Sequence, residues 1–305
     1  AFAFHQREFA VGRGLAEIDA QLVLQIRGGA GATGAPDSTR FEMRFTKQKP
    51  EYTAVVALIG NFGGPEGNGD GLLPGPDDKG GPQFMIPAGA KNHTETMRFT
   101  LPAKVGGGPL PELLLYGVST HMHYVGTDMK IDVERASTTN DDPVDECFLE
   151  TPKWDFNWQR GYDFATPIKI EPGTKLITRY VYDNSKNNPA NPDPTITVKW
   201  GEQSWEEMQY TALGFRWDDE TVADRKDSYQ KELEASRAMG IMDTNLDDKV
   251  AKNEVRGRMA QMLLANWDKV DANHDGFLSN DEMTVINQQI NGRIAAAQAQ
   301  QSIGQ

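Results

Sequence analysis

Two histidines stand one residue apart in Thr120-His121-Met122-His123-Tyr124, in a chain with only five histidines among 305 residues. The surrounding run, LLLYGVSTHMHY, is rich in β-branched and aromatic residues and is predicted to be a strand. Side chains at positions i and i+2 share one face of a strand, so both imidazoles should point the same way and Met122 the opposite way. Two imidazoles on one face are half of a transition-metal site. The alternative is a polar strand face with hydrogen-bonded histidines.

A second group of candidate ligands lies in DANHDGFLSNDE, residues 271–282, which has the spacing of a twelve-residue EF-hand calcium loop. Gly276 stands where such a loop turns sharply, and a hard cation needs many oxygens from one short loop. The expected ligands are Asp271, Asn273, Asp275, the carbonyl of Phe277, Ser279 through a water, and both carboxylate oxygens of Glu282. The alternative is an acidic loop between helices that holds no cation.

The segment DTNLDDKVAKNE, residues 243–254, is a weaker copy of that loop. Its expected ligands are Asp243, Asn245, Asp247, the carbonyl of Lys249, and Glu254. Asp248 replaces the turn glycine, and aspartate tolerates the left-handed conformation better than most residues. The two loops are close in the sequence, so one helix over 255–270 is expected to serve both.

The elements that must position these residues are mainly strands. Many short runs rich in β-branched and aromatic residues, separated by Gly, Pro, Asn and Asp, predict a jelly-roll-like antiparallel β-sandwich. After Trp217 the sequence changes to charged helix formers, which predicts a small α-helical EF-hand domain. The predicted organisation is two strands in 1–52, the sandwich over 53–217, a helical linker with an EF-hand pair over 218–290, and an Ala/Gln-rich tail over 291–305.

Composition narrows the classes of partner. The net charge of −13 argues against a nucleic-acid partner and favours cation binding. Cys147 is the single cysteine, so no internal disulfide is expected. No apolar run reaches the roughly 20 residues of a membrane span. The sequence begins at Ala1 without a basic and apolar leader, so we expect an extracytoplasmic protein (periplasmic, secreted or at the cell surface) that has lost a leader or been released from a longer polypeptide.

Several segments in order resemble the C-terminal domain of the copper type II, ascorbate-dependent monooxygenases, the family of the peptidylglycine α-hydroxylating and dopamine β-hydroxylating enzymes. These segments are YGVSTHMHYVGTDMKI, WDFNWQRGYDF, PGTKLITRYVYDNSKNNPANP and WGEQSWEEMQY. In that family a His-x-His strand and the methionine of a later Gly-…-Glu-Met turn bind the copper that activates dioxygen. The resemblance implies that His121, His123 and Met208 bind copper here. Imidazoles suit both copper oxidation states, and a thioether favours Cu(I).

The resemblance also implies a second copper, held by three histidines in an N-terminal domain, that supplies an electron. Where the family carries one of those histidines, this sequence has Arg27, and an arginine cannot bind copper in its place. His5, His93 and His274 remain, and none is adjacent to another. An upstream segment or a separate chain that carries the tri-histidine copper is therefore an expected partner.

Two functions remain open at this stage. The first is a copper monooxygenase that hydroxylates a C–H bond with dioxygen and an external reductant. The second is a non-catalytic, calcium-stabilised exported structural or assembly module, as a homo-oligomer or part of a surface layer, with a retained or vestigial copper site. The aromatic residues of this region are expected to pack the core and rim of the sandwich, or alternatively to form a substrate platform; they are Trp154, Phe156, Trp158, Tyr162, Trp200 and Trp205.

Overall fold

A computed structural model represents the chain. The residues that it describes are 50–52, 54–61, 84–105, 108–136, 146–245, 247–256, 259–286 and 289. The strands predicted within residues 1–49, with His5 and Arg27, and the predicted tail 291–305 lie outside the described residues.

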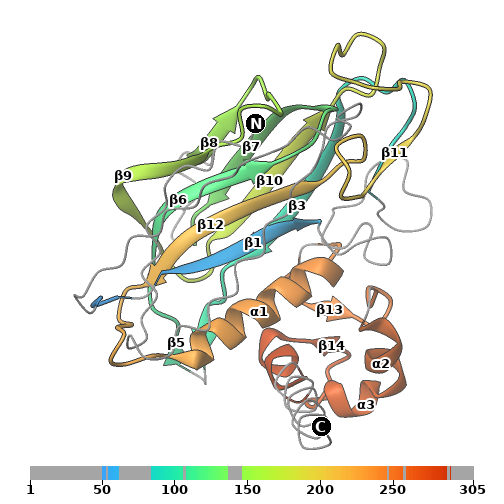
Figure 1. The fold of residues 1–305 in the computed structure, drawn as a ribbon. Helices are drawn as coiled ribbons and strands as arrows, with labels where there is room; N and C mark the ends of the chain where they lie inside the picture. Colours follow the sequence, from blue (N-terminus) through green and yellow to red (C-terminus); the bar gives the residue numbers. More distant parts are fainter. Residues whose placement is uncertain are drawn as a thin grey trace, which may run out of the picture.

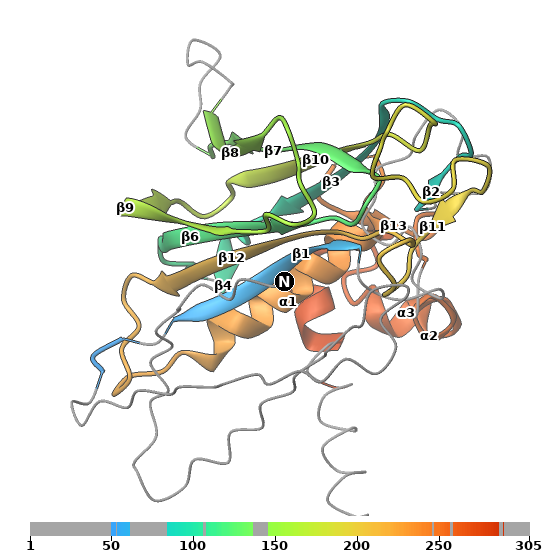
Figure 2. The ribbon, with the colours of Figure 1, turned by 45° about the horizontal axis from the view of Figure 1, so that its top comes forward.

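Two four-stranded antiparallel sheets contain the longest strands of the described chain and stack as two layers (Figures 1 and 2). The first sheet has the order β1 (Val55–Asn61), β12 (Gln209–Trp217), β6 (Leu113–His121) and β9 (Gly161–Ile170). The second has the order β3 (His93–Thr100), β10 (Lys175–Tyr182), β7 (Gly126–Glu134) and β8 (Glu146–Thr151). The prediction of a mainly β protein with antiparallel sheets is confirmed.

Short ladders complete the described strands. They pair β11 (Val198–Lys199) with β2 (Met85–Ile86), β4 (Lys104–Val105) with β5 (Gly108–Pro109), and β13 (Val250–Ala251) with β14 (Phe277–Leu278). Counted in chain order, the eight described strands of six or more residues have the spatial order 1-8-3-6 in one sheet and 2-7-4-5 in the other.

The core lies between the sheets because the central strands alternate buried and half-buried residues. In β12, for example, Leu213, Phe215 and Trp217 are buried and the residues between them are not. The strands β8 and β9 were not predicted from the sequence. Both stand at the end of a sheet, and β9 carries almost no buried residue, so its sequence lacks the apolar alternation of a central strand.

The helical part begins after β12 and contains α1 (Asp227–Met242), α2 (Ala260–Ala265), α3 (Trp267–Val270) and the helical residues 280–286. The single helix expected over 255–270 is wrong, since Asn266 leaves the helical conformation (φ −120°, ψ 22°) and separates α2 from α3. None of the helices in the described ranges is long and apolar enough to cross a membrane.

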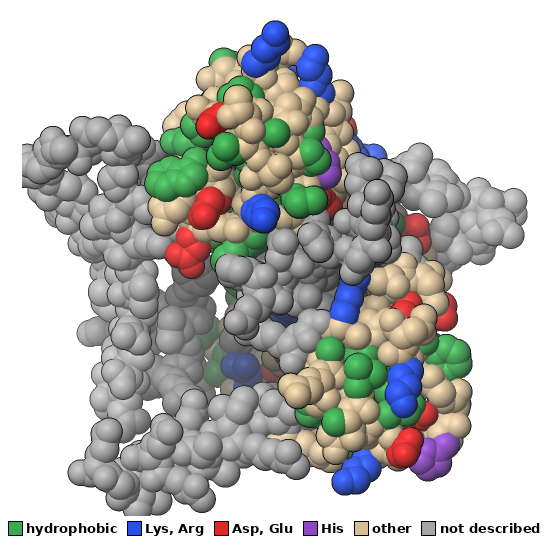
Figure 3. All heavy atoms as spheres, turned by 90° about the vertical axis from the view of Figure 1, so that its right-hand side faces the viewer, with side chains coloured by type: hydrophobic (Ala, Val, Ile, Leu, Met, Phe, Trp, Pro, Cys, Tyr) green, Lys and Arg blue, Asp and Glu red, His purple; other side chains and the backbone are tan. Residues whose placement is uncertain are grey.

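Helix α1 connects the two hydrophobic cores. Its Leu233 joins the core of the sandwich, whereas Met239 and Met242 join a second core formed with residues of α2, α3 and 280–286. On the face shown in Figure 3, the coloured acidic and basic side chains are interspersed among hydrophobic and other residues. That face therefore presents no large patch of a single charge among its described residues.

Candidate metal centres

The strand pair β6 and β12 positions the first candidate centre. The two strands are antiparallel with Tyr210 opposite His121, and the imidazole of His121 stacks on the ring of Tyr210 with centroids 4.6 Å apart. The rings of His121 and His123 lie 4.9 Å apart and perpendicular to each other, while Met122 is fully buried in the core. The two imidazoles therefore lie together, and the residue between them points into the sandwich.

Each imidazole is oriented by a hydrogen bond from its Nδ1. His121 Nδ1 lies 2.5 Å from Oε1 of Gln159, whose own Nε2 donates to the carbonyl of Phe156 at 3.0 Å. His123 Nδ1 donates to the carbonyl of Glu206 at 3.1 Å. Because both acceptors are oxygens, the proton of each neutral ring is on Nδ1 and its lone pair is on Nε2. Metal-binding histidines are commonly held in this way, so the donor set fits a transition metal.

The half-buried Met208 lies at the end of the turn that precedes β12, and His123 lies two residues beyond the end of β6. The backbone N–H groups of both residues donate to the same carboxylate oxygen, Oε1 of Glu207, which brings these two backbone segments together. The turn starts at Gly201, whose N–H donates to the carbonyl of Glu207 at 3.2 Å. A Cβ at Gly201 would meet the carboxylate of Glu206, so a larger residue there would displace that carboxylate from the N–H of Gln203.

Glu207, which the sequence analysis did not single out, ties these segments together. Its Oε1 accepts hydrogen bonds from the backbone N–H groups of His123 and of Met208, the latter at 2.8 Å. Its Oε2 accepts from the N–H of Val125 at 3.2 Å. The side chain is fully buried, and this burial raises its pKa to about 8. The hydrogen bonds from the backbone N–H groups act in the opposite direction and lower the pKa. The available sequence signal was a Glu directly before the candidate ligand Met208.

Of the tryptophans in the segments around this centre, two pack against the core and two are exposed. Trp154 donates Nε1–H to the carbonyl of His123 at 3.3 Å and packs against the core, as does Trp200. Trp158 and Trp205 are instead 62% and 52% exposed. The guanidinium of Arg160 lies 4.7 Å from the centroid of the Trp158 ring. These two exposed rings belong to the same segments that supply Gln159 and Glu206 to the imidazoles.

The other two described histidines, His93 and His274, belong to other parts of the structure. His93 Nε2 lies 2.7 Å from a carboxylate oxygen of Glu95, and His274 is in the loop 271–282 with a positive φ of 59°. In the part of the chain that the structure describes, no group of three or more His, Cys, Asp or Glu side chains could hold a metal ion as it stands. The candidate copper set is of a different type, two imidazoles and a thioether.

The loop 271–282 is the second candidate centre, and its side chains organise its own backbone. Asp271 accepts from the N–H groups of Asp275 and Gly276, both at 3.1 Å. Glu282 accepts from the N–H groups of Ala272 at 2.8 Å and Ser279 at 2.9 Å. Gly276 has a φ of +88°, as expected for the sharp turn. Hydrogen bonds from its own backbone thus hold the side-chain oxygens of Asp271 and Glu282 within the loop. Oxygen donors are the ligands that calcium prefers.

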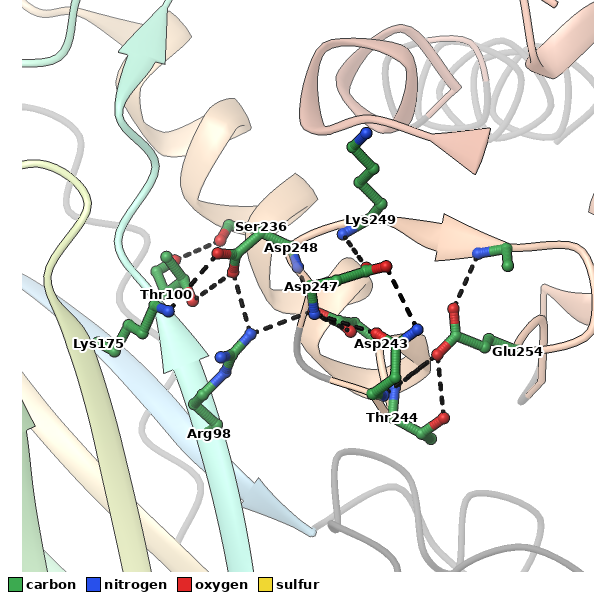
Figure 4. Close-up of polar contacts among 12 residues, drawn as sticks. Arg98, Thr100, Lys175, Ser236, Asp243, Thr244, Asp247, Asp248, Lys249 and Glu254 are labelled. Atoms are coloured by element: carbon green, nitrogen blue, oxygen red, sulfur yellow. Dashed lines mark hydrogen bonds and ion pairs between the residues drawn. The ribbon is translucent and has the colours of Figure 1, made fainter. Parts of the chain in front are cut away.

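The loop 243–254 repeats the same contacts (Figure 4). Asp243 accepts from the N–H groups of Asp247 at 3.2 Å and of Asp248 at 2.9 Å, and Glu254 accepts from that of Ala251 at 2.9 Å. Asp248 has a φ of +62°, at the position equivalent to Gly276. The two loops pair through β13 and β14, with Val250 opposite Leu278. Both loops therefore have the same backbone arrangement and carry oxygen donors of the kind that calcium prefers, although their described acidic side chains do not form a metal site as they stand.

Comparisons with known proteins add little to this geometry. No family model matches the chain, and no curated protein matches it. One similar solved structure is the dimeric latent PorU of Porphyromonas gingivalis, with 8% sequence identity and a TM-score of 0.18. That match covers 55% of this chain and only 13% of the PorU chain, a level of similarity that does not establish a common fold.

Proposed function

We propose that this chain binds one copper ion at His121, His123 and Met208 and belongs to the copper type II, ascorbate-dependent monooxygenases. One observation carries the proposal: the two imidazoles lie 4.9 Å apart with both Nδ1 atoms bonded to protein oxygens, and Glu207 ties the backbone of Met208 to that of His123. The resemblance of the sequence motifs and the 1-8-3-6 and 2-7-4-5 strand orders, which are those of a jelly roll, support it.

The reaction that we propose is the hydroxylation of a C–H bond. One C–H group, one dioxygen, two electrons and two protons give one C–OH group and one water. Copper, when bound, would supply the one-electron chemistry that activates dioxygen. Of the two electrons, one is held at this centre; the other must come from an external reductant or from a tri-histidine copper on an upstream segment or a separate chain, which is the partner we propose.

X-ray absorption of the Cu(I)-loaded chain tests the ligand set. We expect two nitrogen ligands and one sulfur ligand, with the sulfur lost in Met208→Leu and most copper binding lost in His121→Ala. His93→Ala is the matched control, because that histidine contacts Glu95. A wild-type spectrum without sulfur would remove Met208 from the centre. Equal copper binding in His121→Ala and His93→Ala would contradict the site as a whole.

A second function is favoured by the paired loops. We propose that 243–254 and 271–282 form an EF-hand pair that binds calcium and stabilises the helical part of an extracytoplasmic protein. Their repeated internal hydrogen bonds and the β13–β14 pairing support this. A chain that binds calcium but not copper would be the non-catalytic structural or assembly module, and sedimentation with and without calcium would measure its association into homo-oligomers.

A further inference from the structure

The loop 243–254 touches the β-sandwich through a group of charged side chains (Figure 4). Arg98 of β3 donates from Nη2 to Oδ2 of Asp243 at 3.1 Å and to Oδ1 of Asp248 at 3.0 Å. Thr100 Oγ1 donates to the same oxygen of Asp248 at 3.2 Å, and Nζ of Lys175 on β10 lies 3.7 Å from its Oδ2. Side chains of β3 and β10 thus contact Asp243, the first residue of this loop, and Asp248, the residue at its turn.

The pair at the centre of this contact is buried. The side chain of Arg98 is 9% exposed and that of Asp243 is 5% exposed, whereas that of Asp248 is 49% exposed. A buried guanidinium and a buried carboxylate each require the other, because an unpaired charge at such a depth is strongly destabilising. The Arg98–Asp243 pair therefore holds the loop against the sandwich.

Asp248 adds a contact that a glycine could not make. Its φ of +62° is in the left-handed region, which residues other than Gly adopt less readily. The equivalent residue in the other loop is Gly276. The strain at Asp248 is offset by the bonds of its carboxylate to Arg98 and Thr100. The replacement of the turn glycine is accordingly explained by docking to the sandwich.

The second loop has no equivalent of this contact among the described residues. Asp271, which corresponds to Asp243, accepts from the N–H groups of Asp275 and Gly276. Within the described ranges, no Lys or Arg forms an ion pair with Asp271. A cation in the first loop would thus be close to a fixed guanidinium, whereas Asp271 in the second loop has no guanidinium as an ion-pair partner among the described residues.

We propose that Arg98 is an affinity-determining residue for calcium at the loop 243–254, and that it couples calcium there to the docking of the helical part on the sandwich. This inference rests on the proposed calcium binding of the loops. The single positive charge of the guanidinium offsets part of the negative charge of Asp243 and Asp248, so calcium binds this loop more weakly than the loop 271–282. Because coupling between two sites is reciprocal, calcium in the first loop weakens the attraction of Arg98 for these carboxylates.

Calorimetric calcium titration of the full chain tests the affinity. Glu282→Gln is introduced first to disable the second loop, and Arg98→Met is compared in that background with Arg179→Met. Arg179 is the matched control, since it pairs with Asp128 on the sandwich. Arg98→Met should bind calcium about tenfold more tightly, which is the effect of Coulomb repulsion between a divalent cation and a guanidinium about 6 Å apart in a medium with the dielectric constant of water.

Docking is tested separately, in case Arg98→Met does not fold. Asp248→Gly keeps the turn and removes the side-chain contacts with Arg98, Thr100 and Lys175. In calcium-free protein it should raise hydrogen exchange in the second half of α1 by about threefold or more, with no change in Arg179→Met. Unchanged exchange in Asp248→Gly would overturn the docking part of the inference.

The outcomes separate this inference from the proposed function. Calcium binding to neither loop of the wild-type chain would end both. Calcium binding at the second loop, together with equal first-loop affinity in Arg98→Met and Arg179→Met, would overturn the role of Arg98 alone.

Discussion

Substitution of Glu207 by glutamine tests the link between a buried hydrogen-bond network and the candidate copper centre. Because burial raises the pKa of Glu207 to about 8, the comparison is made at a pH above 8, where both oxygens of the ionised carboxylate accept from the backbone N–H groups of His123, Val125 and Met208. The amide side chain of the Glu207→Gln variant would keep one oxygen and present an NH₂ group in place of the other. At the position of Oε1, the N–H groups of His123 and Met208 would then lose their acceptor and face a donor.

The expected loss in the free energy of unfolding follows from the number of backbone N–H groups that lose their acceptor. A buried donor without an acceptor costs about 1–3 kcal/mol, so two such groups lower the free energy of unfolding by about 2–6 kcal/mol. At about 2–4 °C per kcal/mol, the melting temperature should fall by about 4–24 °C. If the amide turns so that its nitrogen replaces Oε2 instead, the N–H group of Val125 is affected and the loss of stability is similar in kind.

The assay combines thermal unfolding with Cu(I) affinity of the same variant. Copper affinity should fall with stability, because the backbones of two candidate ligands are displaced. Glu206→Gln is the control: its carboxylate accepts from the N–H of Gln203 at 2.9 Å in an exposed part of the same turn, and it should change stability by less than about 1 kcal/mol. If Glu207→Gln and Glu206→Gln had the same melting temperature and copper affinity, the reasoning would be refuted.

Three further predictions concern calcium, pH and turnover. Glu282→Gln should abolish most of the calcium-dependent rise in melting temperature, whereas Asp281→Asn, next to it, should keep it; an unchanged calcium response in Glu282→Gln would remove the loop 271–282 as a calcium site. Burial raises the pKa of Glu232, so its stabilising contribution is complete below the unfolded value of 4.5 and is lost as pH rises through the folded pKa. Glu232→Gln should therefore gain stability relative to wild type as the pH rises from about 4 to 7, as measured by melting temperature, and a constant difference would contradict this. The 305-residue chain with copper and ascorbate alone should consume dioxygen in excess of product formed from glycine-extended peptides or phenethylamines, and one-to-one coupling would show that no second copper is needed.

Local patterns in the sequence account for much of the β architecture. The alternation in QYTALGFRW predicts a half-buried strand, and β12 spans the same nine residues with alternating burial. Gly276 and Asp248 occur where a calcium loop needs a left-handed residue, and both have a positive φ. These features depend on neighbours within a few residues, which is why residue type and spacing are enough to predict them.

Two other local predictions did not succeed, one for a reason outside the local pattern and one for a reason within it. The edge strand β9 has little burial and therefore little alternation. The break at Asn266 divides a run of good helix formers, and the side chain of Asn266 bonds to the carbonyl of Met262 at 2.8 Å. The place of β9 in its sheet depends on the fold, whereas the break at Asn266 is local, because an Asn side chain competes for the backbone of its own turn.

The sequence by itself identified the candidate metal ligands and predicted that His121 and His123 point the same way; in the structure β6 ends at His121, and the two rings still lie 4.9 Å apart. Tertiary structure alone decided that the backbones of Met208 and His123 meet, through the buried carboxylate of Glu207 that accepts from both N–H groups. The same holds for Arg98 and Asp243, which are 145 residues apart and meet in a buried ion pair. Contacts of this kind depend on how strands and helices pack, and packing is a property of the whole chain that no short segment encodes.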